Sequence, residues 1–270
     1  MKRVLFFSLL LSMVFSFHAL WAADNFCQEG REVSTEHQQY CLVEKDGKEV
    51  RHGVYKEFHK NGNKKKLGEY IYGAKTGTWT AWNSKGTKVL EEDFQKGLLH
   101  GTVKKWYTNG QLAFEGHYAN GKPVVQRLEW YQDGNKMAEN IYTRKGDEIL
   151  AKRNTWYDNG QKQSSGEYIN GKLNGRETRW HKNGRKRSEY EYRNGRKNGV
   201  CRDWYGNGKE KSLNHFINAK KDGKSIEWYD NGQKKSEGAW SDGREGSWTF
   251  WKASGTVSKQ VVYKNGKQLD

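Results

Sequence analysis

A 24-residue spacing of turn glycines and aromatic residues constrains the fold of this chain more than any other feature. The glycines are Gly62, Gly86, Gly110, Gly134, Gly160, Gly184, Gly208, Gly232 and Gly255. Successive steps are 24 residues, except for 26 before Gly160 and 23 before Gly255. A period of this length is typical of repeat proteins in which each unit buries its apolar surface against the next one.

Each unit carries a second turn, as in Asn120-Gly121, Asn170-Gly171 and Asn194-Gly195. Asn-Gly between short segments rich in aromatic and β-branched residues predicts a β-hairpin, because both turn residues adopt positive φ at low cost. Two turns in 24 residues leave about eight residues for each strand, and no segment is long enough for a stable helix. The sequence therefore predicts an all-β fold, an elongated antiparallel meander of about nine 24-residue β-hairpin repeats with about eighteen strands.

Aromatic residues are expected to supply the core, since only 34% of the chain is hydrophobic while 14% is aromatic. Equivalent strands of successive hairpins lie roughly 9.6 Å apart, so their rings would align in two ladders along the sheet. The first ladder is Phe58, Trp82, Trp106, Trp130, Trp156, Trp180, Trp204, Trp228 and Trp251. The second is Tyr70, Phe94, Tyr118, Tyr142, Tyr168, Tyr192, Phe216, Trp240 and Tyr263. A platform that stacks on sugars or lipid headgroups is the alternative role of these rings.

The repeat is irregular between residues 121 and 152. Pro123 is the only proline, and Val125 stands where a glycine is expected. The next unit carries extra residues around 144–151. Because proline removes a ladder donor, we expect a bulge, a strand break or a kink here; a decayed repeat without a bend is the alternative.

The first residues have the pattern of an export signal. Lys2 and Arg3 precede an apolar run over residues 4–20, and small residues follow at Ala22 and Ala23. This pattern predicts a signal peptide over residues 1–22, with an uncleaved anchor as the alternative. The chain is therefore expected to be exported, to the periplasm or outside the cell, in a bacterial envelope.

Residues 23–52 are expected to form an N-terminal cap, ahead of a repeat array over residues 53–270. Cys27 and Cys41 lie in this cap, and a disulfide between them would contribute roughly 3 kcal/mol in an oxidising compartment. Residues 40–48 have the pattern of the second half of a repeat. The third cysteine, Cys201, falls at a strand position and is interpreted as a packed thiol.

The basic charge predicts acidic partners. The chain carries a formal charge of +16, and 46 basic against 32 acidic residues remain without Lys2 and Arg3. Such a field favours an acidic protein, or else anionic lipid or envelope polysaccharide; export argues against nucleic acid. Lysines that only keep strand faces soluble are the alternative. The candidate partner contacts are Lys104, Lys105, Arg179, Arg202, Lys234 and Lys235.

The sequence contains no recognisable catalytic, metal or phosphate-binding motif, so we predict no catalytic residues, no metal ligands and no cofactor. Glu69, Glu167 and Glu191 recur just before the second aromatic position, and they are expected to face lysine or arginine across adjacent strands. An unrecognised hydrolase is the competing hypothesis. It would need a pocket with converging carboxylates or histidines.

The unit WYDNGQKQSSGEYINGKLNG at residues 156–175 resembles the MORN-repeat variant family, the second MORN type found in YwqK-like antitoxin proteins. The family motif is essentially W-Y-x-N-G-x-K-x-x-E-x-x-Y-x-N-G-K-x-x-G, and the resemblance covers residues 53–270. It implies a twisted antiparallel sheet that binds proteins or membrane surfaces as a scaffold. An antitoxin or immunity role is implied by the resemblance alone.

Overall fold

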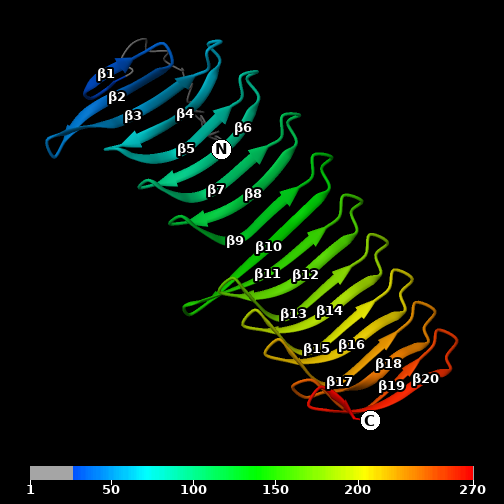
Figure 1. Cartoon of the computed structure of the whole chain (residues 1–270). Helices are drawn as coiled ribbons and strands as arrows, with labels where there is room; N and C mark the ends of the chain where they lie inside the picture. The colour runs from blue at the N-terminus through cyan, green and yellow to red at the C-terminus, as the bar shows by residue number, and fades with distance from the viewer. Residues whose placement is uncertain (1–26, 270) are drawn as a thin grey trace, which may run out of the picture.

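The computed structural model describes residues 27–269, which form a single antiparallel sheet of 21 strands and contain no helix. Every strand pairs with the next one along the chain, so the sheet is a continuous, curved meander with β1 at one end and the last strands at the other (Figure 1). The all-β meander predicted from the sequence is confirmed. The expected signal peptide, residues 1–22, lies outside the described residues.

The strands are β1 Arg31–Ser34, β2 Gln38–Lys45, β3 Lys48–Phe58, β4 Lys64–Ile71, β5 Ala74–Trp82, β6 Lys88–Gln95, β7 Leu98–Trp106, β8 Leu112–Ala119, β9 Lys122–Trp130, β10 Lys136–Lys145, β11 Glu148–Trp156, β12 Lys162–Ile169, β13 Lys172–Trp180, β14 Lys186–Arg193, β15 Arg196–Trp204, β16 Glu210–Ile217, β17 Lys220–Trp228, β18 Lys234–Trp240, β19 Arg244–Trp251, β20 Val257–Lys264 and β21 Lys267–Leu269. The hairpin units occupy β3 to β20, and β1, β2 and β21 flank them.

The two turns of each unit differ in geometry. Asn170 and Gly171 both have positive φ, 48° and 79°, as expected of a two-residue hairpin turn. In the turn after each Trp, only the glycine does: Gly160 has a φ of 78° and donates its N–H to the carbonyl of Tyr157 at 3.0 Å. This is a three-residue loop that ends on a left-handed glycine, so that glycine is the one residue of the loop that the backbone demands.

The turns that follow the Trp positions are tied to one another along one edge of the sheet. The Tyr157 hydroxyl donates to the carbonyl of Trp180 in the next unit at 2.8 Å, and the Asn159 amide donates to the carbonyl of Lys182 at 3.0 Å. Equivalent tyrosine bonds join Tyr107 to Trp130, Tyr131 to Trp156, Tyr205 to Trp228 and Tyr229 to Trp251. The Tyr and Asn of the repeat motif therefore connect successive units as well as forming their own turn.

The irregular region does not interrupt the sheet. Strand β9 contains Pro123 and pairs with β8 and β10 along its length, so there is no strand break. Its register shift, between Gly116 and His117, is of the kind found in other units, for example between Gly166 and Tyr168. Val125 takes the place of the bulge glycine at a φ of 62° and is 64% exposed. The inserted residues extend β10 to ten residues.

The deepest burial belongs to a third row of residues, on one face of the sheet, rather than to the two aromatic ladders. We call it the central row; its members lie seven residues before each turn glycine and pair with the middle of the neighbouring strands. Its buried members are Tyr55, Trp79, Val103, Glu177, Cys201, Ser225 and Trp248. The first ladder stays half-buried because it lies at the strand ends beside the turns, where only one side is covered. The second ladder packs on the same face as the central row, which we call the core face.

The two ends of the core face are aromatic and are built alike. Trp79 lies against Gly68, and its indole N–H donates to the carbonyl of Glu69 at 3.1 Å. Trp248 lies against Gly238 and donates to the carbonyl of Ala239 at 3.1 Å. A glycine on the neighbouring strand gives each indole room to lie flat on the backbone, which closes the two ends of the sheet with large buried rings.

Candidate functional site

Basic side chains stack on the rings of the core face and form a row of their own. They lie eleven residues before the turn glycine, and they are Arg51, Lys75, Lys197, Lys221 and Arg244. The Arg51 guanidinium lies 4.8 Å from the Tyr40 ring and 5.1 Å from the Tyr55 ring. Each such contact contributes about 0.5–1 kcal/mol at an exposed site. We call these five residues the stacked cations.

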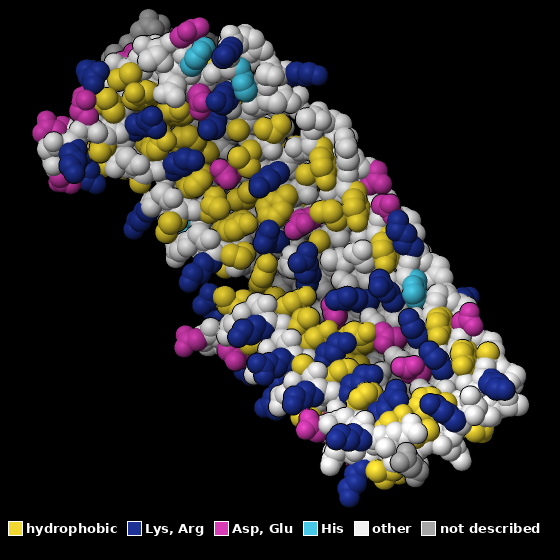
Figure 2. All heavy atoms as spheres, in the orientation of Figure 1, with side chains coloured by type: hydrophobic (Ala, Val, Ile, Leu, Met, Phe, Trp, Pro, Cys, Tyr) yellow, Lys and Arg dark blue, Asp and Glu magenta, His cyan; other side chains and the backbone are white. Residues whose placement is uncertain are grey.

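The stacked cations are held in place but remain open to solvent. The Lys197 ammonium lies 3.8 Å from the Tyr190 ring centre, and Lys75 lies 4.4 Å from that of Trp79. Both lysines are half-buried. Dark-blue basic side chains are interspersed among yellow apolar ones on the face in Figure 2, with apolar side chains most abundant toward the N-terminal strands. The arrangement places fixed positive charges on a broad surface that is not enclosed.

Between its aromatic ends the core face becomes polar. Arg179 donates to the Glu177 carboxylate at 2.9 Å, and Ser212 donates to Asp203 at 2.7 Å. Burial, followed by the charge of Glu177, raises the pKa of Tyr192 to about 12. Burial also raises the pKa of the Tyr190 phenol, and its hydrogen bond to Asp203 acts in the same direction. These phenols are therefore neutral hydrogen-bonding groups at any physiological pH.

The opposite face carries a different stack. Lys186 donates to Glu189 at 2.8 Å while its ammonium lies 5.5 Å from the ring of Trp204 in the next unit. The same arrangement of a lysine between a glutamate and the next Trp recurs at Lys88, Lys136 and Lys234. A lysine from each of these units thus separates the successive rings of the first ladder. The ladder is a lysine–tryptophan stack there rather than a continuous ring stack.

The six candidate contacts predicted from the sequence do not share one face. Lys105, Arg179 and Lys235 belong to the core face, where Lys235 lies 3.7 Å from Glu227. Lys104, Arg202 and Lys234 belong to the opposite face. The stacked cations were not singled out from the sequence. Which rings they lie against depends on a bulge at positive φ, such as Gly199. The bulge changes which residues of the strand point to the core face.

The recurring carboxylates have a backbone role that the sequence did not indicate. Glu191 accepts the backbone N–H of Val200 at 3.3 Å, and Asp93, at the same repeat position, accepts that of Thr102 at 2.9 Å. Each N–H follows a bulge glycine. In these two units the carboxylate pairs with the backbone N–H after the bulge glycine, not with a lysine or arginine across the strands as expected. This bond explains why an acidic residue and a bulge glycine recur together in the repeat.

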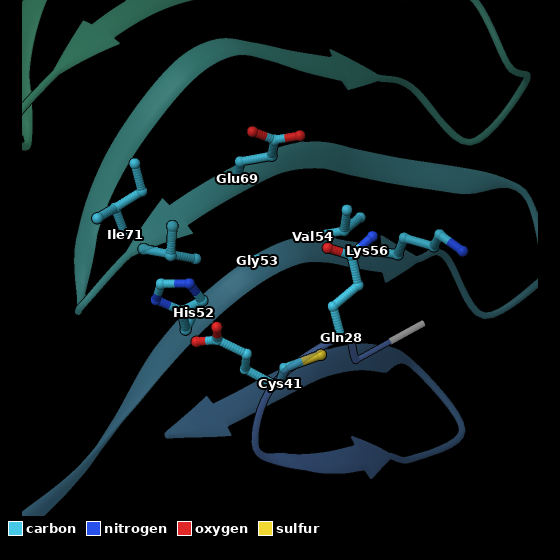
Figure 3. A pocket seen from close by; sticks show the side chains of 10 residues that line it. Gln28, Cys41, His52, Gly53, Val54, Lys56, Glu69 and Ile71 are labelled. Carbon is cyan, nitrogen blue, oxygen red and sulfur yellow. The ribbon is translucent and has the colours of Figure 1, made fainter. Parts of the chain in front are cut away.

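The N-terminal cap forms a hollow beside β2, β3 and β4. A disulfide joins Cys27 to Cys41, and the segment that follows Cys27 lies across the sheet there. The hollow has a volume of about 510 Å³ and is lined by His52, Lys56 and Glu69 among others (Figure 3). No hydrogen bond joins the His52 imidazole to the Glu69 carboxylate among the residues that the structure describes, and the His52 Nδ1 atom accepts the backbone N–H of Tyr72 at 3.3 Å.

Within residues 27–269 no three His, Cys, Asp or Glu side chains lie close enough together to hold a metal ion. No helix of sufficient length and apolar character to cross a membrane occurs over the same residues.

The fold and its surface define a single-sheet β-repeat protein with an open, charged core face. Three segments, residues 51–72, 99–120 and 221–242, match the family described as the MORN repeat variant. They start at the same point of the repeat, which agrees with the spacing found in the sequence. These three segments are therefore similar to MORN-variant repeats, a repeat type suggestive of a binding or scaffold role.

The other comparisons with known proteins give no further support for this class of protein. No curated protein matches the chain. A chain in the crystal structure of TcdB2-TccC3-Cdc42 is similar over 84% of this chain and 16% of its own length, with 11% identity and a TM-score of 0.15. A TM-score of that size does not establish a shared fold.

Proposed function

We propose that this protein is a non-catalytic scaffold that binds an acidic protein along its core face. The observation that carries the proposal is the set of stacked cations. Each is held on an aromatic ring that belongs to the fold, so it loses little conformational freedom when a partner pairs with it. Consecutive members such as Lys197 and Lys221 stand two strands apart, roughly 9.6 Å, so a partner with regularly placed carboxylates would contact several at once.

The proposed site of action is outside the cytoplasm, in the periplasm or beyond the cell. The predicted signal peptide and the Cys27–Cys41 disulfide support export. Within this class, an immunity-like role, in which the partner is an exported toxin, is the version that the resemblance to YwqK-like antitoxin proteins suggests. The alternative ligand is anionic lipid or envelope polysaccharide, which the same cations would attract.

Capture of crosslinked partners from the native envelope tests the proposal with a matched pair of variants. The test variant is Lys75→Gln, Lys197→Gln and Lys221→Gln, which removes three stacked cations. The control is Lys60→Gln, Lys85→Gln and Lys252→Gln, three exposed lysines at turns, which changes the net charge by the same amount. We expect an acidic protein that is recovered with the wild type and the control but lost with the test variant.

Two results would contradict the scaffold role in this form. Equal loss of the partner with both variants would assign binding to net charge rather than to the core face. Sedimentation with vesicles that contain anionic lipid, lost at high salt and in the test variant, together with no recovered protein, would assign the face to the envelope surface instead.

A further inference from the structure

The core face carries one pair of like charges at a position where some other units carry an acid and a base. Two residues on neighbouring strands make up this position: the residue five before the turn glycine and the residue three after it. Glu57 and Lys65 occupy it in one unit, 2.6 Å apart, and Glu227 and Lys235 occupy it in another, 3.7 Å apart. On the β13–β14 hairpin the two residues are both arginines, Arg179 and Arg187. Like charges at neighbouring strand positions are unfavourable unless an anion lies between them.

The two arginines line the same space. They border a hollow of about 250 Å³ together with Tyr157, Ser164 and Glu177. They also border an adjoining hollow of about 190 Å³ on the far side of the hairpin. Arg187 has no hydrogen-bond or ion-pair partner among residues 27–269, whereas Arg179 is oriented by its bond to Glu177. One guanidinium is therefore fixed and the other is free to close on a ligand.

A buried carboxylate orients one of the two guanidinium groups in this hollow. Glu177 is 6% exposed, and its Oε1 atom accepts the bond from Arg179. Its Oε2 atom is buried and closed to the hollow, and the Tyr192 phenol lies beside the same carboxylate as a donor. The hollow thus offers two donors of charged hydrogen bonds, one of them oriented by an enclosed carboxylate.

Charge determines which ligand fits. Two guanidinium groups and one carboxylate give the first hollow a net charge of +1, which one carboxylate neutralises. A phosphate, with nearly two negative charges, would leave the hollow with a net negative charge beside the Glu177 carboxylate. A carboxylate side chain of a peptide carries one negative charge and leaves the hollow neutral. A planar carboxylate also matches the fork of an arginine.

We propose that the hollow between Arg179 and Arg187 receives an aspartate or glutamate side chain of the partner protein. The inference rests on the proposed scaffold function and identifies where on the core face the partner is anchored. The volume of about 250 Å³ exceeds that of several water molecules, so a carboxylate with its adjoining methylenes fits.

The experiment is a titration of the full chain followed through the arginine side-chain Nε–H resonances. The probe is N-acetyl-glutamate N-methylamide, and the neutral comparison is N-acetyl-glutamine N-methylamide. We expect saturable shifts of the Arg179 and Arg187 resonances with the glutamate probe in the millimolar range and none with the glutamine probe. Arg187→Gln should weaken binding about tenfold or more, which corresponds to one charged bidentate contact.

The matched control is Arg193→Gln, which removes the same charge from the exposed end of the same strand, β14, and should leave binding unchanged. Arg187 is itself exposed, and a far-UV spectrum identical to that of the wild type verifies that its replacement leaves the fold intact. Three results would overturn the proposal: no shift with the glutamate probe, equal shifts with the glutamine probe, or tighter binding of inorganic phosphate. If these occur while the triple lysine variant still loses its partner, the scaffold function stands and only the anchor is wrong.

Discussion

Replacing Gly238 by alanine tests whether the Trp–Gly contacts hold the ends of the sheet. A Cβ atom at Gly238 would lie 2.2 Å from the Cδ2 atom and 2.3 Å from the Cε2 atom of Trp248. Ordinary carbon–carbon contacts are about 3.5 Å or longer, so the indole would have to move by about 1.3 Å. Trp248 is only 2% exposed and is enclosed by Tyr263, Phe250 and Arg244, which leave it no free direction.

The expected cost of Gly238→Ala follows from these contacts. Overpacking a filled site costs about 1–3 kcal/mol, and loss of the indole bond to the Ala239 carbonyl adds about 1 kcal/mol. We therefore expect the free energy of unfolding to fall by about 2–4 kcal/mol. The backbone of Gly238 is not in the left-handed region, so an alanine there is unfavourable only because of the contact with Trp248.

Gly206→Ala is the matched control, because it makes the same chemical change where a Cβ atom meets nothing within 4 Å and φ is outside the left-handed region. It should raise the free energy of unfolding by about 0.4–1 kcal/mol, by restricting the unfolded chain. The two variants should thus change stability in opposite directions in urea unfolding followed by far-UV circular dichroism. Amide exchange on β18 and β19 then locates the loss.

A double substitution separates the contact from other causes. Val103 occupies the same place in the central row of another unit and is buried, so Trp248→Val introduces a residue that this row already accommodates. Combined with Gly238→Ala, it should cost at least about 1 kcal/mol less than the sum of the two single changes. The reasoning is refuted if Gly238→Ala stays within about 0.5 kcal/mol of the wild type, or if the two changes are additive.

Three further perturbations address the turns, the bulge and the ion pairs. Tyr157→Phe removes the hydroxyl bond to the Trp180 carbonyl and should lower the free energy of urea unfolding by about 1 kcal/mol; an unchanged midpoint would mean that the turn ties are not stabilising. Val125→Gly should raise the thermal midpoint, because a β-branched residue at a φ of 62° is strained, and a lower midpoint would contradict this. The pKa of Glu189 is held below its ordinary value of 4.5, chiefly by its hydrogen bond from Lys186, so the stability it contributes is present above about pH 4.5 and is lost as the pH falls through the lowered pKa. Urea midpoints measured from pH 7 to pH 3 should therefore decline less steeply for Glu189→Gln than for the wild type. Parallel curves would mean that the Lys186–Glu189 ion pair does not contribute to the pH dependence of stability.

The sequence predicted the fold because the information for it is local. Each turn is specified by its own residues, as at Asn170-Gly171, and the 24-residue spacing then fixes which strands are neighbours. The core was harder to predict. A strand has two faces, and a bulge at positive φ, such as Gly175, resets which residues share a face within every unit. The aromatic residues were therefore identified correctly as recurring positions, while the buried row between them was not.

The candidate site was predicted only in part, for a different reason. Arg179 was among the contacts predicted from the sequence, but Arg187 was not, because a single exposed arginine in a basic chain carries no signal by itself. The signal lies in comparing units. The position carries opposite charges in the pairs Glu57–Lys65 and Glu227–Lys235, and the Arg179–Arg187 pair differs from them. Such a comparison requires knowing that the residues five before and three after the turn glycine lie side by side, and the three-dimensional structure shows this.

The polar middle of the core face is tolerable because other parts of the molecule hold the units together. Buried polar groups need partners, and several have them: Ser225 of the central row donates to Asn214 on the neighbouring strand at 2.8 Å. The ties between turns act along one edge of the sheet and involve backbone carbonyls, so they are independent of what the core face carries. The large rings at both ends close the sheet where it would otherwise be open. Because this face does not have to supply the whole core, it can hold a like-charged pair such as Arg179 and Arg187, whose repulsion a bound carboxylate would reduce.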